Sequence, residues 1–185
     1  QGIERAFLCV GFLSQKIIDY FSYEFEGVRL IYSYDDFKAY CIRGTAGCLA
    51  PLLTQTGDSD FLVLNGDTFI NGLNIADFYN FHTTLFRKTS SASSIAVYED
   101  TVKFDKTIVS VDAYSNYALL QGKQVRSTFS AGAYFLSRDF LYKVERELEI
   151  ADAVDLDEFL AHEGTSERLF GYEIPGTENF FVFDI

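Results

Sequence analysis

The stretch Phe61-Leu-Val-Leu-Asn-Gly-Asp-Thr68 decides how the rest of the chain is interpreted. Its four apolar residues predict a buried strand, which Asn65-Gly66 ends with a turn. Asp67 then follows the carboxyl end of the strand, the place where ligands bind in open parallel sheets. A carboxylate there suits Mg²⁺, which prefers oxygen ligands and usually keeps phosphates as co-ligands. The alternative is a plain turn in which Asp67 caps the next segment, and the motif alone leaves both interpretations open.

Strand and helix patterns alternate on both sides of this stretch. We expect strands at Arg5–Val10, Val28–Tyr32 and Ser94–Tyr98, a helix that Ser14 would cap, and another helix around Ile75–His82. This alternation is typical of an α/β fold with a mostly parallel sheet and helices on both faces. After residue 100 the short alternating runs Val102–Phe104 and Ile108–Val111 predict a small antiparallel excursion. Further strands at 129–136, 169–174 and 180–184, and helices that Ser137 and Asp155 would cap, complete one expected domain over residues 1–185.

Three further features could carry chemistry. Gly44-Thr-Ala-Gly47 opens a helix-like stretch, where small residues and N–H groups at a helix start can approach a ligand. The alternative is a tight turn with Thr45 as its cap, and Pro51 requires any helix there to be short or kinked. Gly132 lies inside a strand, which indicates that something approaches the backbone closely. Asp184 ends the apolar run Phe180–Phe183 and is by itself a weak signal.

Composition excludes several classes of protein. The chain has 185 residues, of which 48% are hydrophobic and 23% charged, so it can form a core and is not disordered. No apolar run approaches the roughly 20 residues that cross a bilayer, so we expect no membrane segment. With 15 Lys and Arg against 27 Asp and Glu, the net charge of −12 disfavours nucleic-acid binding.

Cysteine and histidine give mainly negative information. The three cysteines show no CxxC spacing, which favours a reduced, cytoplasmic location. His82 falls on the apolar face of its predicted helix, and two isolated histidines make a zinc site a poor interpretation. Ser/His/Asp catalysis is rejected because no serine has the required strand–turn–helix context. Because the chain has no Met and ends in a strand-like run, we expect an interior fragment of a longer product.

Taken in order, five stretches resemble the sugar-1-phosphate nucleotidyltransferases, in particular their heptose 1-phosphate and mannose-1-phosphate guanylyltransferase branch. They are residues 2–21 (GIERAFLCVGFLSQKIIDYF), GTAG at 44–47, FLVLNGDTF at 61–69, SAGAYFLSRDFL at 130–141 and FFVFDI at 180–185. The resemblance implies a Rossmann-like catalytic domain that here lacks its first strand and its phosphate loop. It also implies a reaction that joins a nucleoside triphosphate, with GTP expected, to a sugar 1-phosphate and releases pyrophosphate.

The resemblance assigns roles to residues of this chain. Asp67 and Asp184 would be catalytic and hold Mg²⁺, and Gly132 would face the sugar. Gly44, Thr45, Asn65 and Gly66 would face the nucleotide. The expected partners are therefore a nucleoside triphosphate and a sugar 1-phosphate, with no nucleic acid and no membrane, and a homo-oligomer is compatible with the family.

Some positions depart from the family pattern. Ile42-Arg43 replaces a Pro-Leu pair, Ser130 stands where an Asn is expected, and Asp112-Ala113 is the nearest candidate for a Glu-Lys pair. The family's Gly-rich loop and its Lys would precede this chain, so we expect the chain alone to be inactive. Two alternatives stay open: a non-catalytic relative that binds a nucleotide sugar or a partner subunit, and a thymidylyl- or uridylyltransferase of the same fold.

Overall fold

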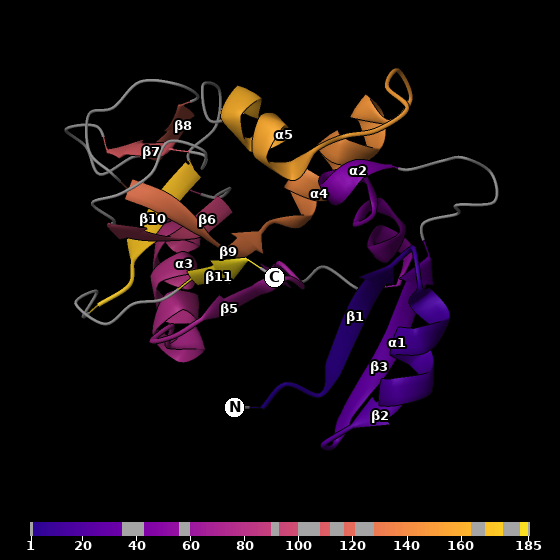
Figure 1. The fold of residues 1–185 in the computed structure, drawn as a ribbon. Coiled ribbons are helices and arrows are strands. Elements are labelled where there is room, and N and C mark those ends of the chain that lie inside the picture. The colour runs from indigo at the N-terminus through magenta and orange to yellow at the C-terminus, as the bar shows by residue number, and fades with distance from the viewer. Residues whose placement is uncertain are drawn as a thin grey trace. The chain divides into compact units, whose positions relative to one another are not determined.

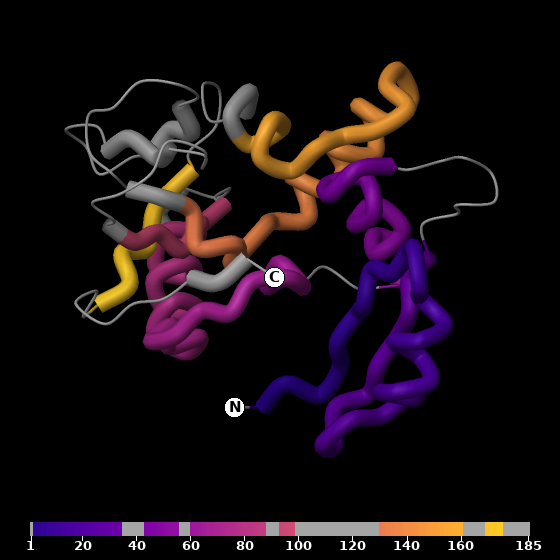
Figure 2. The backbone as a smooth tube through the Cα atoms, viewed as in Figure 1, coloured from indigo at the N-terminus to yellow at the C-terminus, as the bar shows by residue number. Residues whose placement is uncertain are grey.

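A computed structural model describes residues 2–34, 43–55, 60–89, 93–99, 108–111, 117–120, 128–163, 169–175 and 182–184. The backbone forms two compact units, traced in Figure 2. Unit 1 comprises residues 1–57 and 141–156, and unit 2 comprises residues 58–140 and 157–185. Each unit is described by itself below.

Unit 1 is built on a small sheet in the order β1-β3-β2 (Figure 1). Strands β1 (Arg5–Val10) and β3 (Val28–Tyr34) are parallel, and β2 (Glu24–Phe25) pairs antiparallel with β3. Helix α1 (Ser14–Phe21) forms the connection between β1 and β3, which is how parallel neighbours are normally joined.

The rest of unit 1 is helical. Helix α2 (Gly44–Gly47) is followed by the 3₁₀ helix η2 (Ala50–Thr54), and α4 (Arg138–Glu147) contributes the residues from Leu141 onward. Pro51 lies at the start of η2, where its missing N–H is harmless. The buried apolar residues are Val10, Leu30, Ala46, Leu49, Ala50, Leu52, Leu53, Leu141, Val144, Val154 and Leu156.

Unit 2 is built on a larger sheet in the order β10-β6-β9-β7-β8, with β4 pairing to β9 outside that path (Figure 1). Its strands are β4 (Phe61–Leu64), β6 (Ser93–Glu99), β7 (Ile108–Val111), β8 (Tyr117–Leu120), β9 (Thr128–Leu136) and β10 (Leu169–Glu173). A separate antiparallel ribbon joins β5 (Thr68–Ile70) to β11 (Val182–Asp184). Helix α5 (Leu156–Glu163) precedes β10.

Helix α3 (Ile75–Thr89) covers this sheet with aromatic side chains. Phe78 is fully buried and packs edge-on against Phe135 of β9, and its ring stacks on Tyr172 of β10. The same cluster includes the small residues Ala131 and Ala133 of β9, whose size lets the helix approach the sheet. The core of unit 2 therefore fixes β9 from one face.

The expected α/β class is confirmed, and the structure corrects the prediction that the sheet is mostly parallel: in the described part of the chain the sheets are mixed. Strands β4 and β6 run in the same direction, as the intervening α3 predicts, but β9 lies antiparallel to both. β9 therefore lies between β4 and β6, which would be direct neighbours in a simple parallel sheet. Only the β1–β3 and β10–β6 pairs are parallel among the described strands.

Most element positions follow the sequence expectations. The predicted bounds of β1, β4 and β7 agree with the structure. Ser14 does not cap α1: it is the first helical residue, and Leu13 occupies the cap position with a φ of 60° and no side-chain bond. Ser137 does cap α4, since its Oγ accepts a hydrogen bond from the Phe140 N–H at 3.3 Å. The expected strand at 102–104 and the Ile42 and Asp112-Ala113 positions lie outside the described residues.

Candidate active site

The turn after β4 presents its polar groups to solvent. Asn65, Gly66 and Asp67 are all exposed, because β4 has ended and β5 begins only at Thr68. The Thr68 hydroxyl donates to Asp67 Oδ1 at 3.1 Å, which biases the orientation of the carboxylate. The structure thus places Asp67 where the sequence predicts it, at the carboxyl end of a partly buried strand.

Asp184 comes to the same place from the other end of the chain. Strand β11 pairs with β5 (Figure 1). This pairing places Asp184 opposite Thr68, the residue next to Asp67. The backbones that carry the two predicted metal ligands are therefore neighbours. The described residues contain no group of three or more His, Cys, Asp or Glu side chains arranged to hold a metal. Mg²⁺ is usually held by only one or two carboxylates together with substrate phosphates, a number that two acidic residues can supply.

A bulge in β9 brings Gly132 against this turn. The Asn65 N–H donates to the Gly132 carbonyl at 2.9 Å. Gly132 has a φ of 74°, and a Cβ at this position would lie 2.9 Å from Asn65 Nδ2. Glycine is favoured here mainly by this φ, which other residues rarely adopt, and a Cβ would in addition displace the Asn65 side chain. The close approach predicted for Gly132 is thus, within the protein, the approach of Asn65.

The GTAG motif in unit 1 is engaged by the segment that precedes α5. Gly44 has a φ of 77°, and a Cβ there would lie 2.5 Å from the Val154 carbonyl oxygen. The N–H groups of Ala46 and Gly47 both donate to that oxygen, at 2.9 and 3.2 Å. The GTAG backbone therefore binds residue 154 of the same chain.

Thr45 extends this contact with its side chain. Its hydroxyl donates to Asp155 Oδ2 at 2.9 Å and accepts from the Leu156 N–H at 2.7 Å. The sequence expectation that Asp155 caps the next helix missed this bond, which joins residues 110 positions apart. The sequence leaves two roles open for Thr45, capping a turn and facing a nucleotide. The structure adds a third role, the anchoring of residues 154–156.

His82 is a buried structural residue. It is fully buried, its Nδ1 lies 3.0 Å from Ser94 Oγ and its Nε2 lies 3.1 Å from Asp60 Oδ2. Although Asp60, His82 and Ser94 have the residue types of a hydrolase triad, Ser94 is 0% exposed and cannot reach a substrate. The cluster instead ties α3 to the beginnings of β4 and β6, and the predicted position of His82 on the apolar face is confirmed.

The chain is similar to known proteins in sequence and in fold. No protein-family model matches the chain. The bifunctional protein GlmU of Methanococcus vannielii is 27% identical over 180 residues, which are 96% of this chain and 41% of that protein. The chain therefore spans about two fifths of the length of this relative.

Solved structures of nucleotidyltransferases are similar to this chain in fold. HddC from Yersinia pseudotuberculosis matches all of this chain and 74% of its own, with a TM-score of 0.73 and 18% identity. A UTP-bound UGPase from Acinetobacter baumannii matches 99% of this chain and 72% of its own, with a TM-score of 0.71 and 16% identity. The chain has the sugar-1-phosphate nucleotidyltransferase fold.

Within this nucleotidyltransferase fold, the predicted site residues divide between the two units. Asn65, Gly66, Asp67, Gly132 and Asp184 are brought together in unit 2. Gly44 and Thr45 belong to unit 1. Among the described helices none has the length and apolar character needed to span a membrane.

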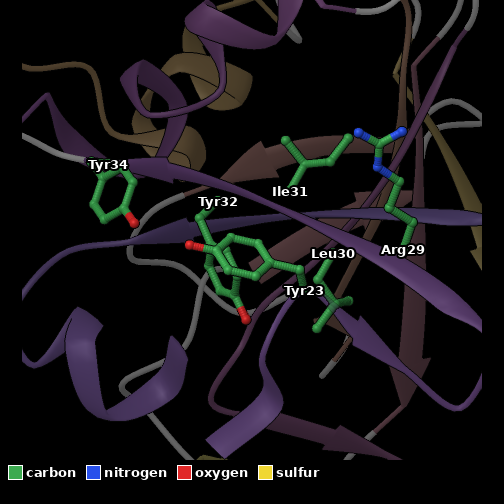
Figure 3. Close-up of a pocket in the computed structure, with 6 residues that line it drawn as sticks. All are labelled: Tyr23, Arg29, Leu30, Ile31, Tyr32 and Tyr34. Carbon is green, nitrogen blue, oxygen red and sulfur yellow. The ribbon is translucent and has the colours of Figure 1, made fainter. Parts of the chain in front are cut away.

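A surface pocket on the nucleotidyltransferase fold is lined by none of the predicted site residues. It measures about 480 Å³ and lies along β3 in unit 1, lined by Tyr23, Arg29, Leu30, Ile31, Tyr32 and Tyr34 (Figure 3). The rings of Tyr23 and Tyr32 meet edge-on, and the Tyr32 hydroxyl donates to the Ser22 carbonyl. Partial burial and then the neighbouring Tyr23 and Tyr34 raise the pKa of Tyr32. In unit 2, partial burial and Asp77 raise the pKa of Tyr172.

The sequence did not reveal one polar network of unit 2. The Gly132 N–H donates to Ser130 Oγ at 3.2 Å, and Ser130 Oγ lies 3.1 Å from the Tyr134 hydroxyl. That hydroxyl donates to Asp157 Oδ1 at 3.2 Å. The only available signal was the departure at Ser130, where the family pattern leads one to expect Asn. The polar role of Tyr134 could not be recognised from the sequence, because the chain has many aromatic residues in apolar runs.

Proposed function

We propose that the polypeptide containing this chain joins a nucleoside triphosphate, with GTP the first candidate, to a sugar 1-phosphate and releases pyrophosphate. The observation that carries the proposal is the pairing of β11 with β5, which sets Asp184 opposite the neighbour of Asp67. Two acidic residues that are 117 positions apart in the chain thereby come to neighbouring backbone positions. The GlmU relative, the HddC structure with GMP-PN and the UTP-bound UGPase support the reaction class.

In this reaction an oxygen of the sugar phosphate attacks the α-phosphorus in line, and the bond from that phosphorus to the pyrophosphate oxygen breaks. Mg²⁺ would supply charge neutralisation for the phosphates, held by Asp67 and Asp184. Thr68 donates to Asp67 and keeps one carboxylate oxygen directed. Asn65 and Gly66 would line the nucleotide side and Gly132 the sugar side. The main contribution of the protein would be to hold the two substrates in the geometry for this attack.

The test is pyrophosphate release by the natural polypeptide that contains this chain. Mannose, glucose and D-glycero-D-manno-heptose 1-phosphates are each combined with GTP, UTP and dTTP in the presence of Mg²⁺. Asp67→Asn and Asp184→Asn should each lower kcat by about a hundredfold or more, because metal-held charge stabilisation is worth several kcal/mol. Glu173→Gln is the matched control, since Glu173 is an exposed carboxylate of unit 2 at the end of β10.

Activity that survives both Asp substitutions would remove the metal role. A second candidate function is a non-catalytic protein that binds a nucleotide sugar, and the departures from the family pattern at Ile42-Arg43 and Ser130 favour it. Such a protein would bind GDP-mannose or UDP-glucose in calorimetry without releasing pyrophosphate. Preference for UTP or dTTP in the same panel would identify the uridylyl or thymidylyl alternative.

A further inference from the structure

Strand β9 has an irregularity at Gly132, which contacts Asn65 at the start of the Asn65–Asp67 turn. On the β6 side, Tyr134 pairs with Ile95 and Ser130 pairs with Val97. Three residues of β9, Ala131–Ala133, therefore face the single residue Ala96. Such a bulge bends a strand and redirects its backbone groups, and bulges of this kind are common next to active sites.

The bulge holds the turn through its central residue. On the other edge of β9 the ladder with β4 ends at the pair Leu64 and Ala133. The next backbone bond, from the Asn65 N–H to the Gly132 carbonyl, therefore depends on the redirected peptide of the bulge. The Asn65 side chain lies against the Cα of Gly132, where a Cβ would be. The position of Asn65, and with it the start of the turn, follows the shape of the bulge.

A polar relay fixes the bulge from its other side. Each hydroxyl has one proton, and that of Tyr134 goes to the Asp157 carboxylate. Ser130 must then donate to Tyr134, which leaves its oxygen lone pairs oriented to accept the Gly132 N–H. The relay ends on a charge, which strengthens its last bond and polarises those before it.

The hydroxyl of Tyr134 serves this relay rather than packing. The Tyr134 side chain is 2% exposed within the β6–β9 layer, where a Phe ring fills nearly the same volume. We propose that Tyr134 is a positioning residue, which holds the Gly132 bulge and through it the Asn65–Asp67 turn by linking Ser130 to Asp157. Its effect on catalysis rests on the proposed function, whereas its effect on the turn does not.

The first experiment measures the turn directly. Amide hydrogen exchange of the natural polypeptide is followed in peptides that cover residues 61–68 and 129–136. Tyr134→Phe should accelerate exchange in both peptides by about tenfold, since one hydrogen bond of ordinary strength is lost. Tyr79→Phe is the matched control, because Tyr79 also packs on Phe135 but is half exposed on α3. Unchanged exchange in both peptides of Tyr134→Phe overturns the proposal.

A second pair of variants decides the matter even where Tyr134→Phe folds poorly. Asp157→Asn keeps an oxygen that can accept from Tyr134, whereas Asp157→Leu removes the acceptor at nearly the same volume. We expect a small acceleration of exchange in Asp157→Asn, because a neutral acceptor forms a weaker bond, and the full tenfold acceleration in Asp157→Leu. Equal exchange in the two variants contradicts the relay.

Kinetics then connect the relay to the proposed reaction. With whichever substrate pair of the panel the wild-type protein uses, Tyr134→Phe should raise both KM values about tenfold, because Gly132 would line the sugar side and Asn65 and Gly66 the nucleotide side. Simple destabilisation would lower the apparent kcat and leave both KM values unchanged, which contradicts positioning. If the wild type releases no pyrophosphate from any pair, the proposed function fails, while the exchange experiment still decides the role of Tyr134.

Discussion

Gly66 lies in the turn after β4, and Gly132 lies in the bulge of β9 that contacts this turn. The surroundings of the two glycines lead to opposite predictions for an added Cβ. At Gly132 the φ of 74° and the 2.9 Å distance to Asn65 Nδ2 both oppose alanine. Gly132→Ala should lower the free energy of unfolding by roughly 1–3 kcal/mol, the usual cost of a strained backbone region. Urea denaturation followed by circular dichroism measures this value.

The matched substitution is Gly66→Ala. A Cβ at Gly66 would have nothing within 4 Å, and its φ is not in the left-handed region. Its stability should change by less than about 0.5 kcal/mol, as for ordinary surface substitutions. Similar losses in the two variants would mean that the bulge does not depend on glycine at residue 132. A large loss of pyrophosphate release in Gly66→Ala at unchanged stability would support the predicted nucleotide contact.

Residue types were readable from the sequence where local geometry decides them. Asp67 after an apolar strand and Gly132 inside one both indicated their positions correctly. The partners of these residues could not be predicted, because they come from distant segments. Asn65 against Gly132, and Tyr134 on Asp157, depend on the order of strands in the sheet. The bonds of His82 to Asp60 and Ser94 were missed for the same reason.

At the scale of elements, the GTAG helix and the segment 154–156 behave as one piece. Thr45→Val removes a hydroxyl that accepts from the Leu156 N–H and donates to Asp155. The free energy of unfolding should fall by about 1–3 kcal/mol, because a backbone donor is left without its partner. Thr45→Ser keeps the hydroxyl and should lose less than half as much. Thermal and urea unfolding of both variants, without any nucleotide, measure the effect.

The same pair of variants separates anchoring from nucleotide contact. If Thr45 only faced the nucleotide, Thr45→Val would keep the wild-type unfolding free energy and lose nucleotide affinity in calorimetry. Loss of stability in the absence of ligand assigns the hydroxyl to the 154–156 segment first. Equal stability of the Val and Ser variants would refute that assignment.

Periodicity and turn residues predicted the elements themselves with small errors. β4, for example, runs from Phe61 to Leu64 as its apolar run and the following Asn-Gly require. The sheet order was not predictable in this way, because β9 reaches its place between β4 and β6 from about 30 residues beyond β6. The direction of β4 relative to β6 follows from the local connection through α3. Which strands become neighbours in the sheet depends instead on contacts between distant segments, such as the packing of Phe78 of α3 on Phe135 of β9.

At the scale of the whole molecule, the charge is an independent source of instability. The 27 acidic and 15 basic residues leave a net charge of −12. The excess carboxylates repel one another most strongly when the chain is folded and they lie close together. Glu145 and Glu149 are exposed in the last turn of α4 and just beyond it, near the negative end of the helix dipole. Added salt should therefore stabilise the protein.

We expect the urea midpoint to rise when NaCl is increased from about 10 mM to about 100 mM, because the screening length falls from roughly 30 Å to roughly 10 Å. The double variant Glu145→Lys and Glu149→Lys changes the net charge by four units, from −12 to −8. It should be more stable at low salt, by about 0.5–1 kcal/mol, and gain less from added NaCl. A midpoint that falls with salt in the wild type, or an equal gain in the variant, would show that attractive pairs outweigh the excess of negative charge.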